Sequence, residues 1–166
     1  TGLFGARLGE LESFLPPTID NSSSTAATKA DGTQTSELSW ITNDYESGLR
    51  QAKADNKPLL IDFTGYTCTN CRWMEVNMFT RAVVREELMK YVRVRLYTDG
   101  EGQPYEGIQQ MQQAKFGTVA LPLYAVVNGD GNTIATFFGL TRDSLEFVSF
   151  LKAGQATLVP ADSPRK

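Results

Sequence analysis

The chain has 166 residues, 41% of them hydrophobic and 21% charged, with a net charge of −3 at pH 7. This composition is typical of a globular domain, and the acidic balance argues against a nucleic-acid partner. No histidine is present, which excludes Ser-His-Asp and Cys-His catalysis and the HExxH zinc helix. The two cysteines cannot alone complete a four-ligand structural zinc site, although a metal shared between chains or completed by carboxylates stays open.

The first 36 residues differ from the rest of the chain. The stretch TGLFGARLGELESFLPP has spaced leucines and phenylalanines before a Pro-Pro stop, so we expect a short amphipathic segment or the end of a longer helix. The stretch NSSSTAATKADGTQTS has no apolar period and is typical of a flexible linker. Because the chain begins at Thr1 without a methionine, we interpret it as a fragment or a processed product.

Strand and helix patterns alternate from Leu38 onward. The expected strands cover residues 38–41, 58–64, 91–97, 123–127 and 133–138. The expected helices cover residues 44–57, 68–79, 81–90, 108–117 and 142–154. Asn43 with Glu46 resembles a capping box, Thr80 and Thr141 are predicted N-caps, and residues 98–106 are predicted to be a polar loop.

This order, β-α-β-α-α-β-α-β-β-α, predicts an α/β fold with helices on both faces of a mixed central sheet. The early strands are expected to pair in parallel, and the NGDGN turn predicts a final antiparallel hairpin. We therefore divide the chain into a segment with a linker (1–36), a folded domain (37–156) and a loose tail (157–166).

The only two cysteines stand three residues apart in YTCTNCR, directly after the apolar strand LLIDF. At a strand-to-helix junction, free backbone N–H groups and the helix dipole favour a thiolate at Cys68. Cys71 lies nearly one helical turn further on the same side, so it can attack a mixed disulfide formed by Cys68. The pattern indicates thiol–disulfide exchange. The alternative is an inert structural disulfide, which would stabilise little because its loop is short.

The core IDFTGYTCTNC and the ALP stretch before the hairpin resemble thioredoxin over residues 38–154. The resemblance is stronger to the C-terminal domain of the transmembrane thiol:disulfide interchange proteins, the DsbD family. The opening GLFGARLGELESFLPP also resembles the segment that follows the last membrane helix in that family.

The resemblance implies a thioredoxin fold and a protein-disulfide reductase whose redox group is the Cys68–Cys71 disulfide, with no metal and no small-molecule cofactor. It implies a periplasmic domain that is tethered to the inner membrane and linked to cytochrome c biogenesis. Its partners would be a membrane-embedded electron donor and disulfide-bearing proteins downstream, with no nucleic acid.

Two acidic residues are candidate catalytic groups, and the DsbD-type domain has acids at both matching positions. Asp62 lies on the strand before the cysteines; if a helix covers it, burial should raise the pKa of its carboxyl, which could accept the proton of Cys71. The alternative is a partly hydrated Asp at a strand end. Glu75 shares a helical stripe with Cys68 and Cys71 and could raise the pKa of a nearby thiol. It could equally be an exposed partner of Arg72.

Tyr66, Leu121 and Pro122 are candidate substrate-binding residues. Tyr66 could belong to an apolar docking rim beside the thiols. Most X-Pro bonds are trans, but the resemblance implies that Pro122 is cis and faces the CxxC, with the Leu121 backbone pairing with an extended substrate. Thr69-Asn70 stands where thioredoxin has Gly-Pro, so the sequence does not fix the reduction potential.

Two other functions stay open. One is a stand-alone oxidase or isomerase that uses the same chemistry. The other is a thioredoxin-fold binding module whose CxxC is vestigial or structural.

Overall fold

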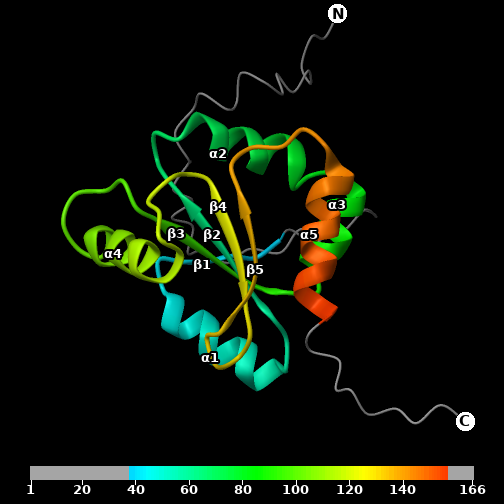
Figure 1. The fold of residues 1–166 in the computed structure, drawn as a ribbon, viewed down its shortest axis with the longest axis horizontal. Helices are drawn as coiled ribbons and strands as arrows, with labels where there is room; N and C mark the ends of the chain where they lie inside the picture. Colours follow the sequence, from blue (N-terminus) through cyan, green and yellow to red (C-terminus); the bar gives the residue numbers. More distant parts are fainter. Residues whose placement is uncertain (1–37, 157–166) are drawn as a thin grey trace, which may run out of the picture.

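The computed structural model describes residues 38–156, so the predictions for residues 1–36 and 157–166 lie outside the described residues. A mixed five-stranded sheet forms the centre, in the order β1-β3-β2-β4-β5 (Figure 1). The strands are β1 (Ile41–Thr42), β2 (Leu59–Thr64), β3 (Val92–Tyr97), β4 (Leu123–Val127) and β5 (Thr133–Phe138). β2 pairs in parallel with β3 and antiparallel with β4, and β4 continues antiparallel into β5. The predicted element order and the final hairpin are confirmed.

Helices cover both faces of this sheet, as predicted (Figure 1). One face carries α2 (Thr69–Trp73), the π-helical segment η2 (Met74–Met78), α3 (Ala82–Leu88) and α5 (Ser144–Ala156). The other face carries α1 (Tyr45–Asp55) and α4 (Tyr105–Phe116). Each side has its own apolar core, so every residue of β2 is buried between the two. This explains why its sequence is a continuous run without a polar face.

Alternation along the central strand decides which residues face the thiol-bearing helix. Leu60 belongs to the core under η2, α3 and α5, whereas Leu59 and Ile61 belong to the core under α1 and α4. Asp62 and Thr64 follow Leu60 at intervals of two and therefore face the same side as the helix after β2. The strand therefore places the Asp62 carboxyl and the Thr64 hydroxyl beneath that helix.

Several predicted element ends are wrong. Asn43 is not the N-cap of α1: it has a positive φ of 55°, and its side chain accepts a hydrogen bond from the Tyr97 N–H at 2.9 Å. Asp44 caps the helix instead, because its Oδ1 accepts from the Ser47 N–H at 2.9 Å. The first strand lies at residues 41–42 rather than 38–41.

Four helix ends also differ from the prediction. The Thr80 hydroxyl donates to the Val76 carbonyl of the preceding helix, so α3 starts at Ala82 without a side-chain cap. Thr141 precedes α5 by three residues, and its hydroxyl donates to Glu146. α4 begins at Tyr105, inside the loop predicted at 98–106, and α5 runs past Gly154 to Ala156. Thr80 and Thr141 thus bond to residues four and five positions away instead of capping the helices that follow them.

Candidate redox site

The two cysteines lie at the junction between β2 and α2. Cys68 is the N-cap residue of α2, and its Sγ accepts a hydrogen bond from the Cys71 N–H at 3.2 Å. A disulfide joins the pair, with the Cα atoms 5.3 Å apart. Cys71 is only 1% exposed, whereas Cys68 is half-buried. An incoming molecule therefore reaches Cys68 first, which fits the predicted attacker and resolver.

The helix that carries the thiols is less regular than predicted. After one turn of α-helix, the chain widens into the π segment η2, where the Phe79 N–H donates to the Met74 carbonyl at 2.9 Å. Glu75 lies in this segment. Isolated π turns are rare and are often found at functional sites.

Asp62 is buried as expected, with 1% of its surface exposed. Its pKa is raised because burial disfavours the charged carboxylate, although Arg95 and Arg72 oppose that effect. The Asp62 Oδ2 atom accepts a hydrogen bond from the Arg95 Nε at 3.0 Å. The neighbouring strand places Arg95 there, since Asp62 and Arg95 are register partners in the β2–β3 pair. Sequence reasoning did not find Arg95, because strand register cannot be read from the two strands separately.

Glu75 combines features of both predicted alternatives. It pairs with Arg72, with 2.5 Å between Nη1 and Oε2, but its side chain is only 12% exposed. The Glu75 Oε1 atom lies 3.8 Å from the Arg95 Nε and also accepts from the Thr64 hydroxyl at 3.4 Å. Burial raises the pKa of Glu75 to about 7, opposed by Arg95 and reinforced by Asp62. Glu75 is therefore a buried carboxyl with a proton affinity suited to neutral pH.

Together these residues form a charge cluster of Asp62, Arg95, Glu75 and Arg72 behind the thiols. Asp62, Glu75 and Arg72 are almost enclosed, and the guanidinium of Arg95 stacks on the ring of Trp40, 4.5 Å from its centroid. Arg72 is itself a buried member of the cluster.

A hollow of about 300 Å³ opens beside the charge cluster. Glu75 and Arg95 line it, together with the apolar side chains of Leu38, Trp40 and Phe79. Glu75 and Arg95 are therefore the members of the charge cluster that border this hollow.

An aromatic stack holds Tyr66, the candidate docking residue. Its ring lies over Tyr97, with centroids 4.1 Å apart and planes 13° apart, and meets the edge of Tyr105 at 5.9 Å. The Tyr66 and Tyr105 hydroxyls are 3.3 Å apart. This hydrogen bond is the largest cause that raises the pKa of Tyr66 to about 12, followed by burial. Tyr66 is thus a fixed part of the site wall and stays neutral at physiological pH.

The Leu121–Pro122 peptide bond is cis, as the resemblance implied. A Cβ placed on Gly65 would lie 3.1 Å from the Leu121 Cδ1, so Leu121 packs directly against the residue three positions before Cys68. Pro122 is buried, and its carbonyl accepts from the Gly139 N–H at 2.9 Å. The structure therefore brings Leu121 and the thiol-bearing turn together; substrate binding by Leu121 and Pro122 stays a prediction.

Asp99 is a further site residue that sequence reasoning did not single out. It follows β3, inside the predicted polar loop, and its carboxylate accepts hydrogen bonds from the Tyr66 and Thr67 N–H groups at 2.7 and 2.9 Å. The parallel pairing of β2 and β3 could have indicated Asp99. The carboxyl ends of parallel neighbours β2 and β3 meet at one edge of the sheet, so residues just after β3 lie near residues just after β2.

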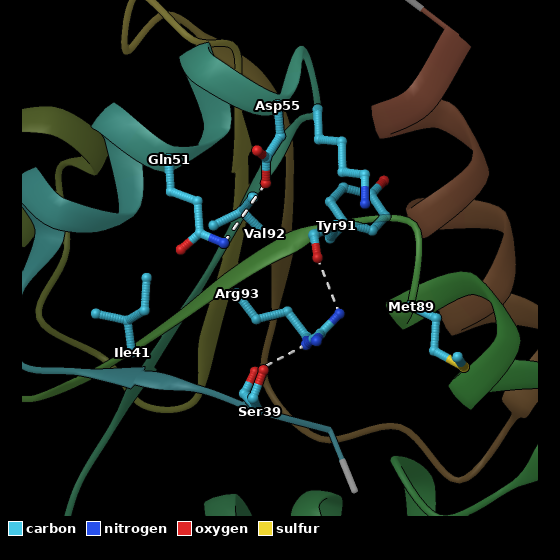
Figure 2. Close-up of a pocket in the computed structure, with 9 residues that line it drawn as sticks. Ser39, Ile41, Gln51, Asp55, Met89, Tyr91, Val92 and Arg93 are labelled. Carbon is cyan, nitrogen blue, oxygen red and sulfur yellow. Dashed lines mark hydrogen bonds between the residues drawn. The ribbon is translucent and has the colours of Figure 1, made fainter. Parts of the chain in front are cut away.

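A second hollow lies at the opposite end of the sheet, near the start of β3 (Figure 2). Arg93 crosses it and donates to the carbonyls of Ser39, Leu88 and Tyr91 at 3.2, 2.5 and 2.9 Å. The guanidinium thus ties the end of α3 to the chain before β1. Since the thiols follow the other end of the parallel strand β2, this hollow is not part of the redox site.

Residues 38–156 hold neither a candidate metal site nor a helix that could span a membrane. No group of three or more His, Cys, Asp or Glu side chains is arranged there to hold a metal ion. No helix in the same range is long and apolar enough to cross a membrane.

Residues 40–129, more than half of the chain, match the family described as thioredoxin-like. The chain belongs to the thioredoxin-like family. No curated protein sequence matches it significantly.

Solved structures agree on the fold. A DsbH oxidoreductase is 21% identical with a TM-score of 0.59, over 80% of this chain and 94% of the other. The reduced DsbD C-terminal domain of Neisseria meningitidis is 16% identical with a TM-score of 0.58, over 69% and 100%. A thioredoxin from Thermus thermophilus is 20% identical with a TM-score of 0.55, over 68% and 85%. The predicted thioredoxin fold is therefore confirmed, and these neighbours do not distinguish a DsbD-type domain from other members.

Proposed function

We propose that the protein is a thiol:disulfide oxidoreductase that works in the reducing direction, as a protein-disulfide reductase. The observation that carries the proposal is the Cys68–Cys71 pair at the start of α2, in which Cys68 is half-buried and Cys71 is nearly enclosed. An inert structural disulfide has no need of this asymmetry. Exchange chemistry needs one accessible attacking thiol and one protected resolving thiol.

The reaction starts from the dithiol form. The Cys68 thiolate attacks one sulfur of a partner disulfide, which forms a mixed disulfide and releases the first partner thiolate. Cys71 then loses its proton and attacks the Cys68 sulfur, which restores the Cys68–Cys71 disulfide and releases the second partner thiolate. Two electrons pass to the partner, and a donor dithiol must reduce the protein again.

The charge cluster supplies a proton acceptor for the second step. Glu75 stands one helical turn after Cys71, and burial raises the pKa of its carboxyl to about 7. Asp62 lies beneath the same helix with a raised pKa. Either carboxylate can take the Cys71 proton, and the adjoining hollow lets Glu75 return it to water.

The finer role that we propose is the output domain of a membrane electron carrier. Two observations support it: the sequence resemblance to the DsbD family and the pairing of Asp62 with a second buried acid, Glu75. In this role the protein is a tethered periplasmic domain, a membrane-embedded domain donates electrons, and disulfide-bearing proteins receive them, including those of cytochrome c biogenesis. No metal, nucleic acid or small-molecule cofactor takes part.

Variants of the two cysteines test the chemistry. Cys68→Ser should abolish reduction of insulin disulfides. Cys71→Ser should accumulate a mixed disulfide at Cys68, detectable by mass spectrometry as one covalently bound partner chain. Wild-type turnover by Cys68→Ser would refute the mechanism, whereas an inactive wild type whose thiols resist alkylation after mild reduction would favour a binding module with a structural CxxC.

The reduction potential tests the direction of electron flow. We expect a value more negative than about −180 mV, on the scale where a strong oxidant lies near −120 mV and thioredoxin near −270 mV. Equilibration with glutathione redox buffers, followed by thiol counting, measures it. A potential near the oxidising end would support the oxidase or isomerase alternative.

A further inference from the structure

The loop after β3 fastens the turn that leads into Cys68. That turn spans Gly65 to Cys68 and is closed by a hydrogen bond from the Cys68 N–H to the Gly65 carbonyl at 3.3 Å. Asp99 Oδ1 accepts from the Tyr66 N–H at 2.7 Å, and Oδ2 accepts from both the N–H and the hydroxyl of Thr67 at 2.9 Å. One carboxylate therefore binds three donors in the two residues directly before Cys68.

The sequence leaves room for this contact. A Cβ on Gly65 would lie 2.7 Å from the Asp99 Oδ2, so any other residue at this position would displace the carboxylate from the turn. A Cβ on Gly100 would lie 2.4 Å from the Tyr105 ring, and Tyr105 in turn holds Tyr66. Gly65 thus lets Asp99 approach the turn, and Gly100 lets the loop after β3 pass close to the Tyr105 ring.

This contact matters most in the reduced protein. In the oxidised form the disulfide itself holds Cys68 against Cys71. Once the disulfide opens, that covalent constraint is gone, and the turn that precedes Cys68 must keep the attacking sulfur in place. We propose that Asp99 is a positioning residue for the redox reaction, which keeps the Gly65–Cys68 turn ordered so that the Cys68 sulfur stays aimed at an incoming disulfide. This inference rests on the proposed function.

The chemistry of the side chain matters as well as its size. Burial works to raise the pKa of Asp99, but hydrogen bonds from Thr67 and Tyr66 outweigh it and leave the pKa below its usual value. The group is therefore a carboxylate at neutral pH, with two oxygens that accept. An asparagine of the same size has one acceptor and would turn an amide N–H₂ toward a backbone donor.

Asp99→Asn tests the proposal through two reactions of the reduced protein: attack on oxidised glutathione and alkylation by iodoacetamide. Attack on a disulfide requires alignment of three sulfur atoms, whereas the small alkylating reagent needs only an accessible thiolate. We expect Asp99→Asn to slow the disulfide reaction at least tenfold and to change alkylation less than threefold. Thr67→Val removes only the hydroxyl bond and should slow the disulfide reaction two- to threefold.

The matched control is Asp130→Asn, at an exposed aspartate paired with Lys53 in the β4–β5 turn, which should leave both rates unchanged. Equal slowing of both reactions by Asp99→Asn would indicate a general loss of structure and overturn the proposal. Wild-type rates in Asp99→Asn would overturn it as well, while normal wild-type turnover shows that the proposed function stands. An inactive wild type with readily alkylated thiols would overturn both. If Asp99→Asn does not fold, the Thr67→Val rate decides.

Discussion

Replacing Glu75 with glutamine should remove a large part of the pH dependence of stability between pH 4.5 and 7. Burial raises the pKa of this carboxyl from 4.5 to about 7 in the folded protein, with Arg95 opposing and Asp62 reinforcing the shift. Within that window the folded state holds a proton that the unfolded state has lost. The contribution to stability is therefore fully present below pH 4.5 and is lost as the pH rises through 7. At 1.36 kcal/mol per pH unit, the loss amounts to about 3 kcal/mol.

The oxidised protein provides a clean assay because its disulfide-bonded cysteines do not titrate. Urea unfolding at steps from pH 4.5 to pH 8 would give the free energy of unfolding of the wild type and of Glu75→Gln. Glutamine keeps the size of the side chain and can still accept from the Thr64 hydroxyl. Because Glu75 is mostly protonated in the folded protein below pH 7, glutamine resembles it there, and the two proteins differ through the proton that the folded wild type retains.

The slope of the unfolding free energy against pH is therefore the quantity that tests the raised pKa of Glu75. Between pH 4.5 and pH 8, the wild type should lose about 3 kcal/mol more than Glu75→Gln, while Asp62 contributes its own slope to both proteins. Glu86→Gln is the matched control, because Glu86 is an exposed glutamate on α3, and its curve should run parallel to the wild type. Parallel curves for the wild type and Glu75→Gln would show that burial does not raise the pKa of Glu75, and the proton-transfer role would lose its basis.

Three further substitutions test buried contacts of the fold by urea unfolding at pH 7. Arg95→Met should cost about 3–5 kcal/mol because it leaves Asp62 buried without its partner, and a cost under 1 kcal/mol would show that the ion pair is not needed. Tyr124→Phe should change stability by less than about 1 kcal/mol, because no residue in the described part of the chain bonds the buried Tyr124 hydroxyl. A larger loss would reveal a missing partner. Gly154→Ala should cost about 1–3 kcal/mol, since the new Cβ would lie 2.7 Å from the Val126 Cγ2, and an unchanged midpoint would contradict the tight packing of α5 on β4.

The sequence predicts best those parts of the fold that depend on one continuous signal. The strand at 58–64 is an unbroken apolar run, so its burial on both faces follows from its composition, and the structure agrees. Cys68 and Cys71 are equally local, because three residues at a strand-to-helix junction define their geometry. The cis bond before Pro122 is different: the resemblance rather than any base rate indicated it.

The parts that escaped prediction depend on pairing between distant segments. Asp62 meets Arg95 only because β2 and β3 align in one particular parallel register. Asp99 reaches the turn before Cys68 only because those two strands end at the same edge of the sheet. Asn43 looked like an N-cap but binds the Tyr97 N–H, across 54 residues of sequence. In all three cases the local pattern is compatible with several structures, and the sheet selects one.

Asp99 and Glu75 both lie near the disulfide, and they should affect different properties of the reaction. Asp99 stays ionised at neutral pH and binds backbone donors, so it should govern the orientation of Cys68 and hence the rate of attack. Glu75 has a pKa of about 7 and lies behind Cys71, so it should govern where the proton goes and hence the pH dependence. Because Asp99 and the charge cluster have no hydrogen-bond partner in common within residues 38–156, the two effects should add when the variants are combined. In the double variant, the loss of Asp99 should therefore change the rate and the loss of Glu75 should change the pH dependence. This follows from the placement of Asp99 beside the Cys68 turn and of Glu75 one helical turn after Cys71.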